Sequence, residues 1–216
     1  MEQKQTIVET DDTSTTLFSE KYGEHYHSTF GAQNESQHIF IEAGFKQIQK
    51  TEVSIFEMGF GTGLNAYLTL KTAQELNKKV KYIGVEKYPV SKDLIQKLSF
   101  ANDKTFLNIH KADWEKEIQI NKHFELLKQK TDLLKYNHKE FYDLVYFDAF
   151  SPEAQPYLWS EDIFRELYNH MNKGAILTTY SVKGIVKRAL KSVGFEIEKL
   201  AGPTGKREIL RAKKID

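Results

Sequence analysis

The feature of the sequence that most constrains the fold is the stretch VSIFEMGFGTGLNAYLTL, from Val53 to Leu70. Its first part is apolar like a buried strand, and its last part has the apolar spacing of a helix. Between them, glycines occupy every second position, at Gly59, Gly61 and Gly63. Glycine permits a tight turn and lets a ligand approach the backbone, and the next helix offers free N–H groups to an anion. A tight strand-to-helix turn that binds nothing is the alternative.

Strand and helix patterns alternate along the rest of the chain, which predicts an α/β fold. We expect a Rossmann-like, mostly parallel seven-stranded sheet with helices on both faces and a C-terminal antiparallel hairpin. The expected strands cover residues 53–58, 80–86, 105–113, 142–150 and 174–181, with the hairpin in 194–214. The expected helices cover residues 34–45, 62–77, 91–98, 160–171 and 182–193, with one or two more in 115–137.

Acidic residues stand where several of these strands end, and α/β folds bind nucleotides at that edge. Glu57 lies near the end of the first strand, and Glu86 follows 23 residues after the last of the three glycines, a spacing suited to a ribose. Asp113, beside Trp114, ends the third expected strand, and Asp148 ends the fourth. For each of them an ordinary structural role, such as a solvated strand-end charge or a turn, is the alternative.

Length and composition limit the number of domains, the metal sites and the location that we expect. A length of 216 residues suggests a single domain over 1–216, in which we expect residues 1–50 to form an N-terminal extension that caps the site. The chain has no cysteine, and its seven histidines show no metal-site spacing, so we expect no metal. No apolar run could span a membrane, and the N-terminus lacks a signal core, so we expect a cytoplasmic location.

The stretch GAQNESQHIFIEAGF precedes the first strand and is expected to form a helix that carries Glu35 and His38 on one face. These two side chains could close over a bound cofactor or acceptor. A pair of surface side chains satisfied by each other is the plainer interpretation.

Several stretches together resemble a known family. FEMGFGTGLN, YIGVEKYPV, DLVYFDAFSPEAQPYLW, GAILTTYS and KREILRA match, in order, the methyltransferase domain of the MnmC family of bacterial tRNA enzymes. The likeness runs from about Phe18 to Ala212, and D-A-F-S-P…P…W is its most specific part. The resemblance implies a class I methyltransferase that uses S-adenosylmethionine.

Carried onto this chain, the resemblance gives the strand-end residues roles. Glu57 and the three glycines would cradle the methionine part of S-adenosylmethionine, and Glu86 would hold its ribose. Asp113 and Trp114 would hold the adenine. Asp148 would be the catalytic residue beside the transferable methyl group, either accepting the proton of an amine or binding the amino group of the cofactor.

The resemblance implies N-methylation of 5-aminomethyl(-2-thio)uridine at the wobble position of tRNA. Well-known family members fuse this domain to a flavin-dependent oxidase that prepares the amine; this sequence resembles the stand-alone form, so a separate enzyme is expected to form the aminomethyl group. The net charge of +1 does not point to RNA, so tRNA phosphates would need local basic residues. The candidates are Lys183, Lys187, Arg188, Lys191, Lys206, Arg207, Arg211, Lys213 and Lys214.

Other functions stay open at this point. A methyltransferase that acts on a small-molecule or protein amine would share the same cofactor residues. A non-catalytic RNA- or partner-binding domain would not need the set Glu57, Glu86 and Asp148. The spacing of the glycines and the terminal hairpin both argue against a nicotinamide-dependent dehydrogenase.

Overall fold

The computed structural model describes residues 4–216, which contain a large and a small β-sheet. The large sheet has eight strands in the order β10-β11-β9-β8-β4-β5-β7-β6. Its strands are β4 Glu52–Met58, β5 Lys79–Glu86, β6 Glu117–Asn121, β7 Phe124–Lys130, β8 Tyr142–Phe147, β9 Met171–Thr179, β10 Glu196–Ala201 and β11 Glu208–Lys213. The small sheet consists of β1 Gln5–Glu9, β2 Thr15–Ser19 and β3 Glu24–His25, and it is antiparallel.

The centre of the large sheet is parallel, since β9, β8, β4, β5 and β7 run in the same direction. Strand β11 pairs antiparallel with β9 and forms a hairpin with β10. The predicted α/β class, with a mostly parallel sheet and a C-terminal antiparallel hairpin, is therefore confirmed. The eighth strand is β6, which pairs antiparallel with β7 at the opposite edge.

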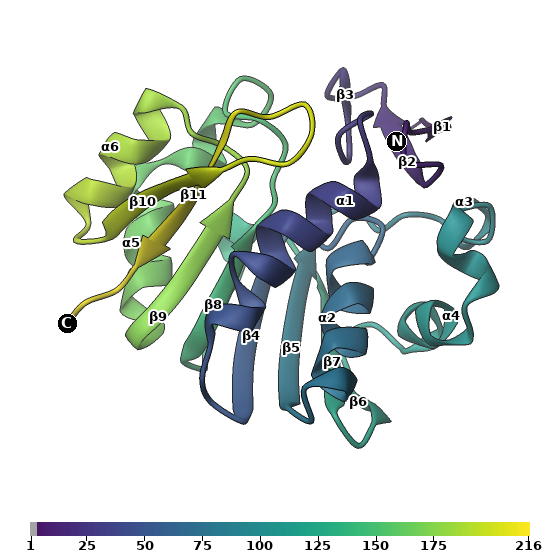
Figure 1. The fold of residues 1–216 in the computed structure, drawn as a ribbon, viewed down its shortest axis with the longest axis horizontal. Helices are drawn as coiled ribbons and strands as arrows, with labels where there is room; N and C mark the ends of the chain where they lie inside the picture. The colour runs from purple at the N-terminus through teal and green to yellow at the C-terminus, as the bar shows by residue number, and fades with distance from the viewer. Residues whose placement is uncertain (1–3) are drawn as a thin grey trace.

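Helices cover both faces of this sheet (Figure 1). Side chains of α2, α4 and a π-helical turn at Gln37–Glu42 pack on one face, and those of α5 and α6 on the other. The α-helices are α1 Ala32–Ser36, α2 Leu64–Glu75, α3 Lys92–Ile95, α4 Lys104–Lys111, α5 Glu161–Asn169 and α6 Gly184–Ser192. Within residues 4–216, no helix is both long and apolar enough to cross a membrane.

Strand β8 shows why the sheet needs a layer on each side. All six of its residues are buried. Leu144 and Tyr146 belong to the core under α2, whereas Val145 and Phe147 belong to the core under α5 and α6. A strand that is apolar on both faces is typical of the centre of a parallel sheet.

The strand expected over residues 105–113 is wrong, because helix α4 occupies this segment. The carboxylate of Asp103 accepts the N–H of Thr105 at 2.7 Å and so caps the helix. Phe106 and Ile109 lie three residues apart and are both buried. The residue types in this segment favour a strand, but the buried ones have the spacing of a helix that begins at the Asp103 cap.

The helices expected within residues 115–137 are also wrong, because the hairpin of β6 and β7 occupies most of this segment. In β7 the buried residues are Phe124, Leu126 and Lys128, which alternate as in a strand. Lys128 is 1% exposed and donates to the carbonyl of Ile109 at 2.9 Å. Because a lysine fills a core position, the alternation of apolar and polar residues that is typical of a strand cannot be seen in the sequence of β7.

The small sheet lies beyond the carboxyl ends of the central strands, as Figure 1 shows. The loop between β10 and β11 reaches toward the same end of the large sheet (Figure 1). Segments from both ends of the chain therefore meet at the edge where α/β folds bind their ligands.

Candidate active site

The three glycines between β4 and α2 all have positive φ, at 88° for Gly59, 51° for Gly61 and 72° for Gly63. A Cβ at Gly59 would lie 2.4 Å from the carbonyl oxygen of Asp148, closer than real atoms approach. The N–H of Asp148 in turn donates to the carbonyl of Met58 at 3.0 Å. The absence of a side chain at Gly59 thus lets the ends of β4 and β8 meet.

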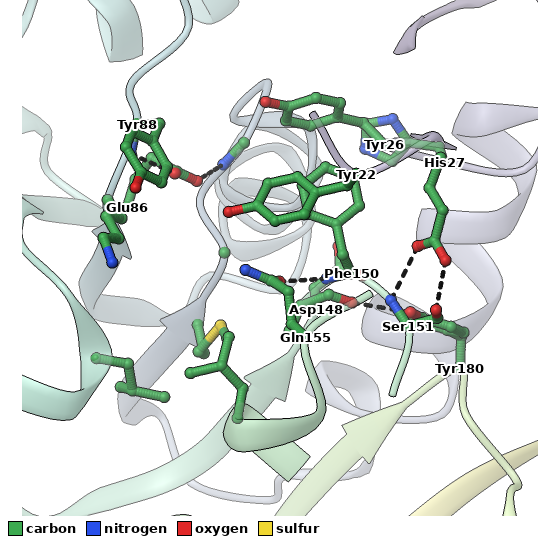
Figure 2. Close-up of a pocket in the computed structure, with 18 of the residues that line it drawn as sticks. Tyr22, Tyr26, His27, Glu86, Tyr88, Asp148, Phe150, Ser151, Gln155 and Tyr180 are labelled. Atoms are coloured by element: carbon green, nitrogen blue, oxygen red, sulfur yellow. Dashed lines mark hydrogen bonds between the residues drawn. The ribbon is translucent and has the colours of Figure 1, made fainter. Parts of the chain in front are cut away.

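A cavity of about 420 Å³ lies at this edge of the sheet, and Gly59, Gly61, Glu86 and Asp148 are among the residues that line it. In Figure 2, Glu86 and Tyr88 lie on one side and Tyr180 on the other, with Asp148 between them. Five parts of the chain form the walls: the N-terminal segment, the ends of β4, β5 and β7, the loop after β8, the end of β9 with Tyr180, and the β10–β11 turn.

The glycine loop and Glu86 are brought into direct contact. The Glu86 carboxylate accepts the N–H of Gly61 at 3.1 Å and the N–H of Tyr88 at 2.7 Å. Burial raises the pKa of Glu86 in spite of these hydrogen bonds, which favour its ionised form. The two strongest signals of the sequence therefore meet at one wall of the cavity.

The adjacent strand, β7, leads to an acidic residue that the sequence reasoning missed. Asp132 lines the cavity, accepts the N–H of Leu134 at 3.2 Å and pairs with Lys87 at 2.5 Å. Had β7 been predicted as a strand, the residues directly after it would have pointed to Asp132.

Asp113 and Trp114 are not among the residues that line the cavity, contrary to expectation. Asp113 follows α4, is exposed, and pairs with Lys116 at 2.8 Å. Trp114 packs edge-on against Phe60, with ring centroids 5.9 Å apart. The reason is the mistaken strand at residues 105–113, since Asp132 holds the strand-end position that Asp113 was expected to hold.

Asp148 belongs to a small polar network beneath the cavity. Nδ2 of Asn65, on α2, donates to Oδ2 of Asp148 and to Oε1 of Glu57, at 2.9 Å in each case. Burial and the nearby Glu35 raise the pKa of Asp148 to about 8, although the hydrogen bond from Asn65 opposes the shift. Asp148 is therefore a carboxyl group that can hold or release a proton near neutral pH.

Glu57 lies behind this network and is not among the residues that line the cavity. It is fully buried, and burial raises its pKa well above the usual range. Its contact with the site runs through Asn65, which the sequence reasoning missed. Asn65 follows the glycine motif by two positions, so only the geometry of the first turn of α2 could have identified it.

The N-terminal segment contributes aromatic residues that were also missed. Tyr22 and Tyr26 both pack against Phe150, with ring centroids 4.5 and 5.0 Å apart, and all three line the cavity (Figure 2). Burial raises the pKa of Tyr26, so it stays neutral. Within residues 4–216, no group of three or more acidic or histidine side chains is placed to hold a metal ion.

Comparison with known proteins identifies the family. A family model described as S-adenosyl-L-methionine-dependent methyltransferase matches residues 74–215. The bifunctional protein MnmC of tRNA 5-methylaminomethyl-2-thiouridine biosynthesis is 28% identical over 88% of this chain in Marinomonas sp. (strain MWYL1). The corresponding protein of Campylobacter fetus subsp. fetus (strain 82-40) is 29% identical over 91% of this chain. The chain spans only 31% and 34% of these two relatives.

Two crystal structures have the same fold. MnmC2 from Aquifex aeolicus matches 100% of this chain and 71% of its own, with a TM-score of 0.85 and 25% identity. Spermidine synthase from Thermotoga maritima also matches 100% of this chain, with a TM-score of 0.63 and 16% identity, which shows a shared fold. Because the family model covers most of the chain, the protein belongs to the family of S-adenosyl-L-methionine-dependent methyltransferases.

Proposed function

We propose that this protein methylates the primary amine of 5-aminomethyl(-2-thio)uridine at the wobble position of tRNA. The named relatives belong to tRNA 5-methylaminomethyl-2-thiouridine biosynthesis, and the likeness to MnmC2 extends over the whole chain. The observation that carries the proposal is Asp148, a carboxyl group with a pKa of about 8 that faces the cavity at the end of β8.

The residues of the cavity fit S-adenosylmethionine, which supplies an electrophilic methyl group when bound. Gly59 and Gly61 line the cavity with backbone alone, and this suits the methionine part. Glu86 offers a half-buried carboxylate to the ribose hydroxyls. Asp132 follows the end of β7, the strand next to that of Glu86, so we assign it, in place of Asp113, to the adenine. Glu57 and Gly63, also predicted to bind the cofactor, do not line the cavity: Glu57 reaches it through Asn65, and Gly63 forms the positive-φ start of α2.

An amine must be neutral to attack a methyl group, and this requirement gives Asp148 its role. Alkylamines are protonated at neutral pH, with a pKa as high as ~10.4 for the lysine side chain. Transfer of that proton to an ordinary aspartate would be uphill by roughly six pKa units, but the raised pKa of Asp148 reduces the gap to roughly two. Asp148 therefore orients the ammonium, accepts its proton and leaves a neutral nucleophile in place.

We further propose that the N-terminal extension, residues 1–50, caps the site within a single domain. Tyr22 and Tyr26 support this role, because they join the extension to Phe150 across the cavity. Residues 1–3 lie outside the described part of the chain. Exclusion of water by such a cap strengthens the electrostatic interactions inside.

tRNA is the proposed partner, together with a separate enzyme that forms the aminomethyl group, and the cytoplasm is the proposed location. The proposed phosphate contacts are the basic residues at and before α6, namely Lys183, Lys187, Arg188 and Lys191, and those in and after the β10–β11 turn, namely Lys206, Arg207, Arg211, Lys213 and Lys214. The turn of that hairpin reaches the cavity wall through Lys206. Phosphate contacts of this kind position the RNA, whereas the cavity selects the base.

The substitution Asp148→Asn tests the mechanism. The asparagine keeps the shape of the side chain, and its amide oxygen can still accept the hydrogen bond from Asn65. It removes the group that accepts a proton. We expect S-adenosylhomocysteine to bind nearly as well as in the wild type, while methyl transfer to tRNA slows by ~10²–10⁴-fold. Asp162→Asn, on the exposed side of α5, is the matched control and should keep full activity. Undiminished turnover in Asp148→Asn would remove Asp148 from the reaction.

A further inference from the structure

A lysine side chain occupies the part of the cavity opposite Glu86. The Nζ atom of Lys206 lies 3.3 Å from Oε1 of Glu35 and 5.0 Å from the ring centroid of Tyr180. Lys206, Glu35, Tyr180 and Asp148 all line the cavity. A primary alkylammonium group thus lies between a carboxylate and an aromatic face, in the same cavity as the carboxyl group assigned to the reaction.

Glu35 is held in place as a buried anion. It is 8% exposed, and its Oε2 atom accepts the N–H of Ser28 at 2.6 Å. Its charge reaches Asp148, since Glu35 raises the pKa of that residue while Lys206 lowers it. The charges of Glu35 and Lys206 therefore act in opposite directions on Asp148.

Tyr180 is fixed as well. Its hydroxyl donates to the carbonyl of Ala149 at 2.8 Å, in the residue after Asp148. Figure 2 shows Tyr180 on the side of Asp148 that is remote from Tyr88. This bond ties the aromatic face to the loop that carries Asp148.

The position of Lys206 is built into the β10–β11 turn. A Cβ at Gly205, where φ is +83°, would lie 2.2 Å from the ring of Phe30, and a Cβ at Gly202 would lie 2.3 Å from the carbonyl oxygen of Lys206. The N–H of Lys206 donates to the carbonyl of Pro203 at 2.9 Å. The side chain itself remains 30% exposed, so it can leave the cavity without unfolding the turn.

We propose that Glu35, the face of Tyr180 and Asp148 form the binding site for the primary ammonium group of the acceptor, and that Lys206 occupies this site until the acceptor displaces it. The proposal rests on the function proposed above and names the subsite that recognises its amine. Lys206 and a 5-aminomethyl group end in the same chemical unit, a CH₂–NH₃⁺ group, so the same partners suit both.

Displacement by an acceptor exchanges one ion pair for another. A buried carboxylate without a partner is costly, and Lys206 supplies that partner while no acceptor is bound. Once released, Lys206 lies beside Arg207 in a turn where it can pair with an RNA phosphate. An amine attached to RNA therefore has an advantage over a free amine, which must displace Lys206 without offering it a phosphate.

Binding of free nucleosides to the protein loaded with S-adenosylhomocysteine tests the subsite without any turnover. The probes are 5-aminomethyluridine and its neutral analogue 5-hydroxymethyluridine, titrated by calorimetry. We expect Lys206→Met to bind the aminomethyl nucleoside about tenfold more tightly than the wild type, as removal of a competing ammonium predicts. We expect Glu35→Gln to lose the preference for the amine over the hydroxyl.

The two control substitutions, one of a lysine and one of a glutamate, lie outside the cavity. Lys199 pairs with Glu208 at 2.9 Å on the same hairpin, and Glu42 pairs with Lys46 at 2.7 Å, so Lys199→Met and Glu42→Gln should bind both nucleosides as the wild type does. Equal affinities in Lys206→Met and Lys199→Met, or an amine preference retained in Glu35→Gln, would overturn the proposal. Failure of the wild type to methylate tRNA would refute the proposed function alone, because the binding assay needs no transfer.

Discussion

The neighbours of Asp148 shift its pKa in opposite directions. Burial and Glu35 raise its pKa to about 8, whereas the amide of Asn65 and the ammonium of Lys206 lower it. The residue is thus kept near the midpoint of its titration at neutral pH, the state in which a side chain best accepts and releases a proton.

The raised pKa of Asp148 also predicts how stability depends on pH. Between the ordinary value of 3.8 and about 8, the unfolded chain has lost the proton that the folded chain retains, so stability falls as pH rises through this window. Asp148→Asn removes this loss. We expect the melting temperature of Asp148→Asn minus that of the wild type to increase from pH 5 to pH 8, by several degrees.

Differential scanning fluorimetry at matched ionic strength measures this difference. Glu86 also has a raised pKa, but both proteins contain it and Asp148 is not among the groups that shift it, so its contribution cancels. A melting-temperature difference that stays constant across the window would show that Asp148 titrates normally.

At the same scale, the sequence predicted Gly59, Gly61, Glu86 and Asp148 at the cavity, but it missed Asp132 and Asn65 and wrongly expected Asp113 and Trp114 there. Glu86 and Gly61 meet as their strand-end positions suggest. Glu57 reaches Asp148 only through Asn65, and Lys206 reaches Glu35 across most of the chain. Contacts between residues so distant in sequence depend on tertiary packing, which no local pattern encodes.

At the scale of secondary-structure elements, the glycine loop is a junction between two strands as well as the proposed cofactor cradle. Gly59→Ala would place a methyl group against the carbonyl oxygen of Asp148, whereas Gly174→Ala would place one in open space, with nothing within 4 Å. Both glycines have positive φ, at 88° and 78°, so both variants carry similar backbone strain of ~1–2 kcal/mol.

We therefore expect Gly59→Ala to lower the free energy of unfolding by ~1–3 kcal/mol more than Gly174→Ala does, since only Gly59→Ala must push strands apart. Urea unfolding measures this difference. Stabilisation by S-adenosylhomocysteine should persist in Gly174→Ala and be largely lost in Gly59→Ala. Equal losses in the two variants would mean that the loop tolerates a side chain.

The elements that sequence patterns predicted poorly lie between β5 and β8. Helix α4 contains strand-favouring residues under the cap of Asp103, and β7 places Lys128 in the core. The strands β4, β5 and β8, which are rich in apolar residues, were predicted within about three residues of their true bounds. Local patterns succeed where burial follows polarity and fail where a polar residue fills a core position.

At the scale of the whole molecule, an N-terminal segment and the β10–β11 turn converge on the cavity at the carboxyl edge of a class I methyltransferase sheet. The N-terminal extension brings Tyr22 and Glu35, and the C-terminal hairpin brings Lys206. The alternation of strands and helices predicted the sheet, but it gave no information on how these two segments close around the cavity. Their arrangement places Tyr180, part of the proposed amine subsite, opposite Glu86, with Asp148 between them.

The most direct test is nucleoside analysis of tRNA from a strain that forms the aminomethyl group but cannot methylate it. The tRNA is incubated with the protein and S-adenosylmethionine, digested, and analysed by mass spectrometry. We predict conversion of 5-aminomethyl-2-thiouridine into 5-methylaminomethyl-2-thiouridine, dependent on S-adenosylmethionine and strongly reduced in Asp148→Asn. No conversion, or a methyl group on a different nucleoside, would contradict the proposed function.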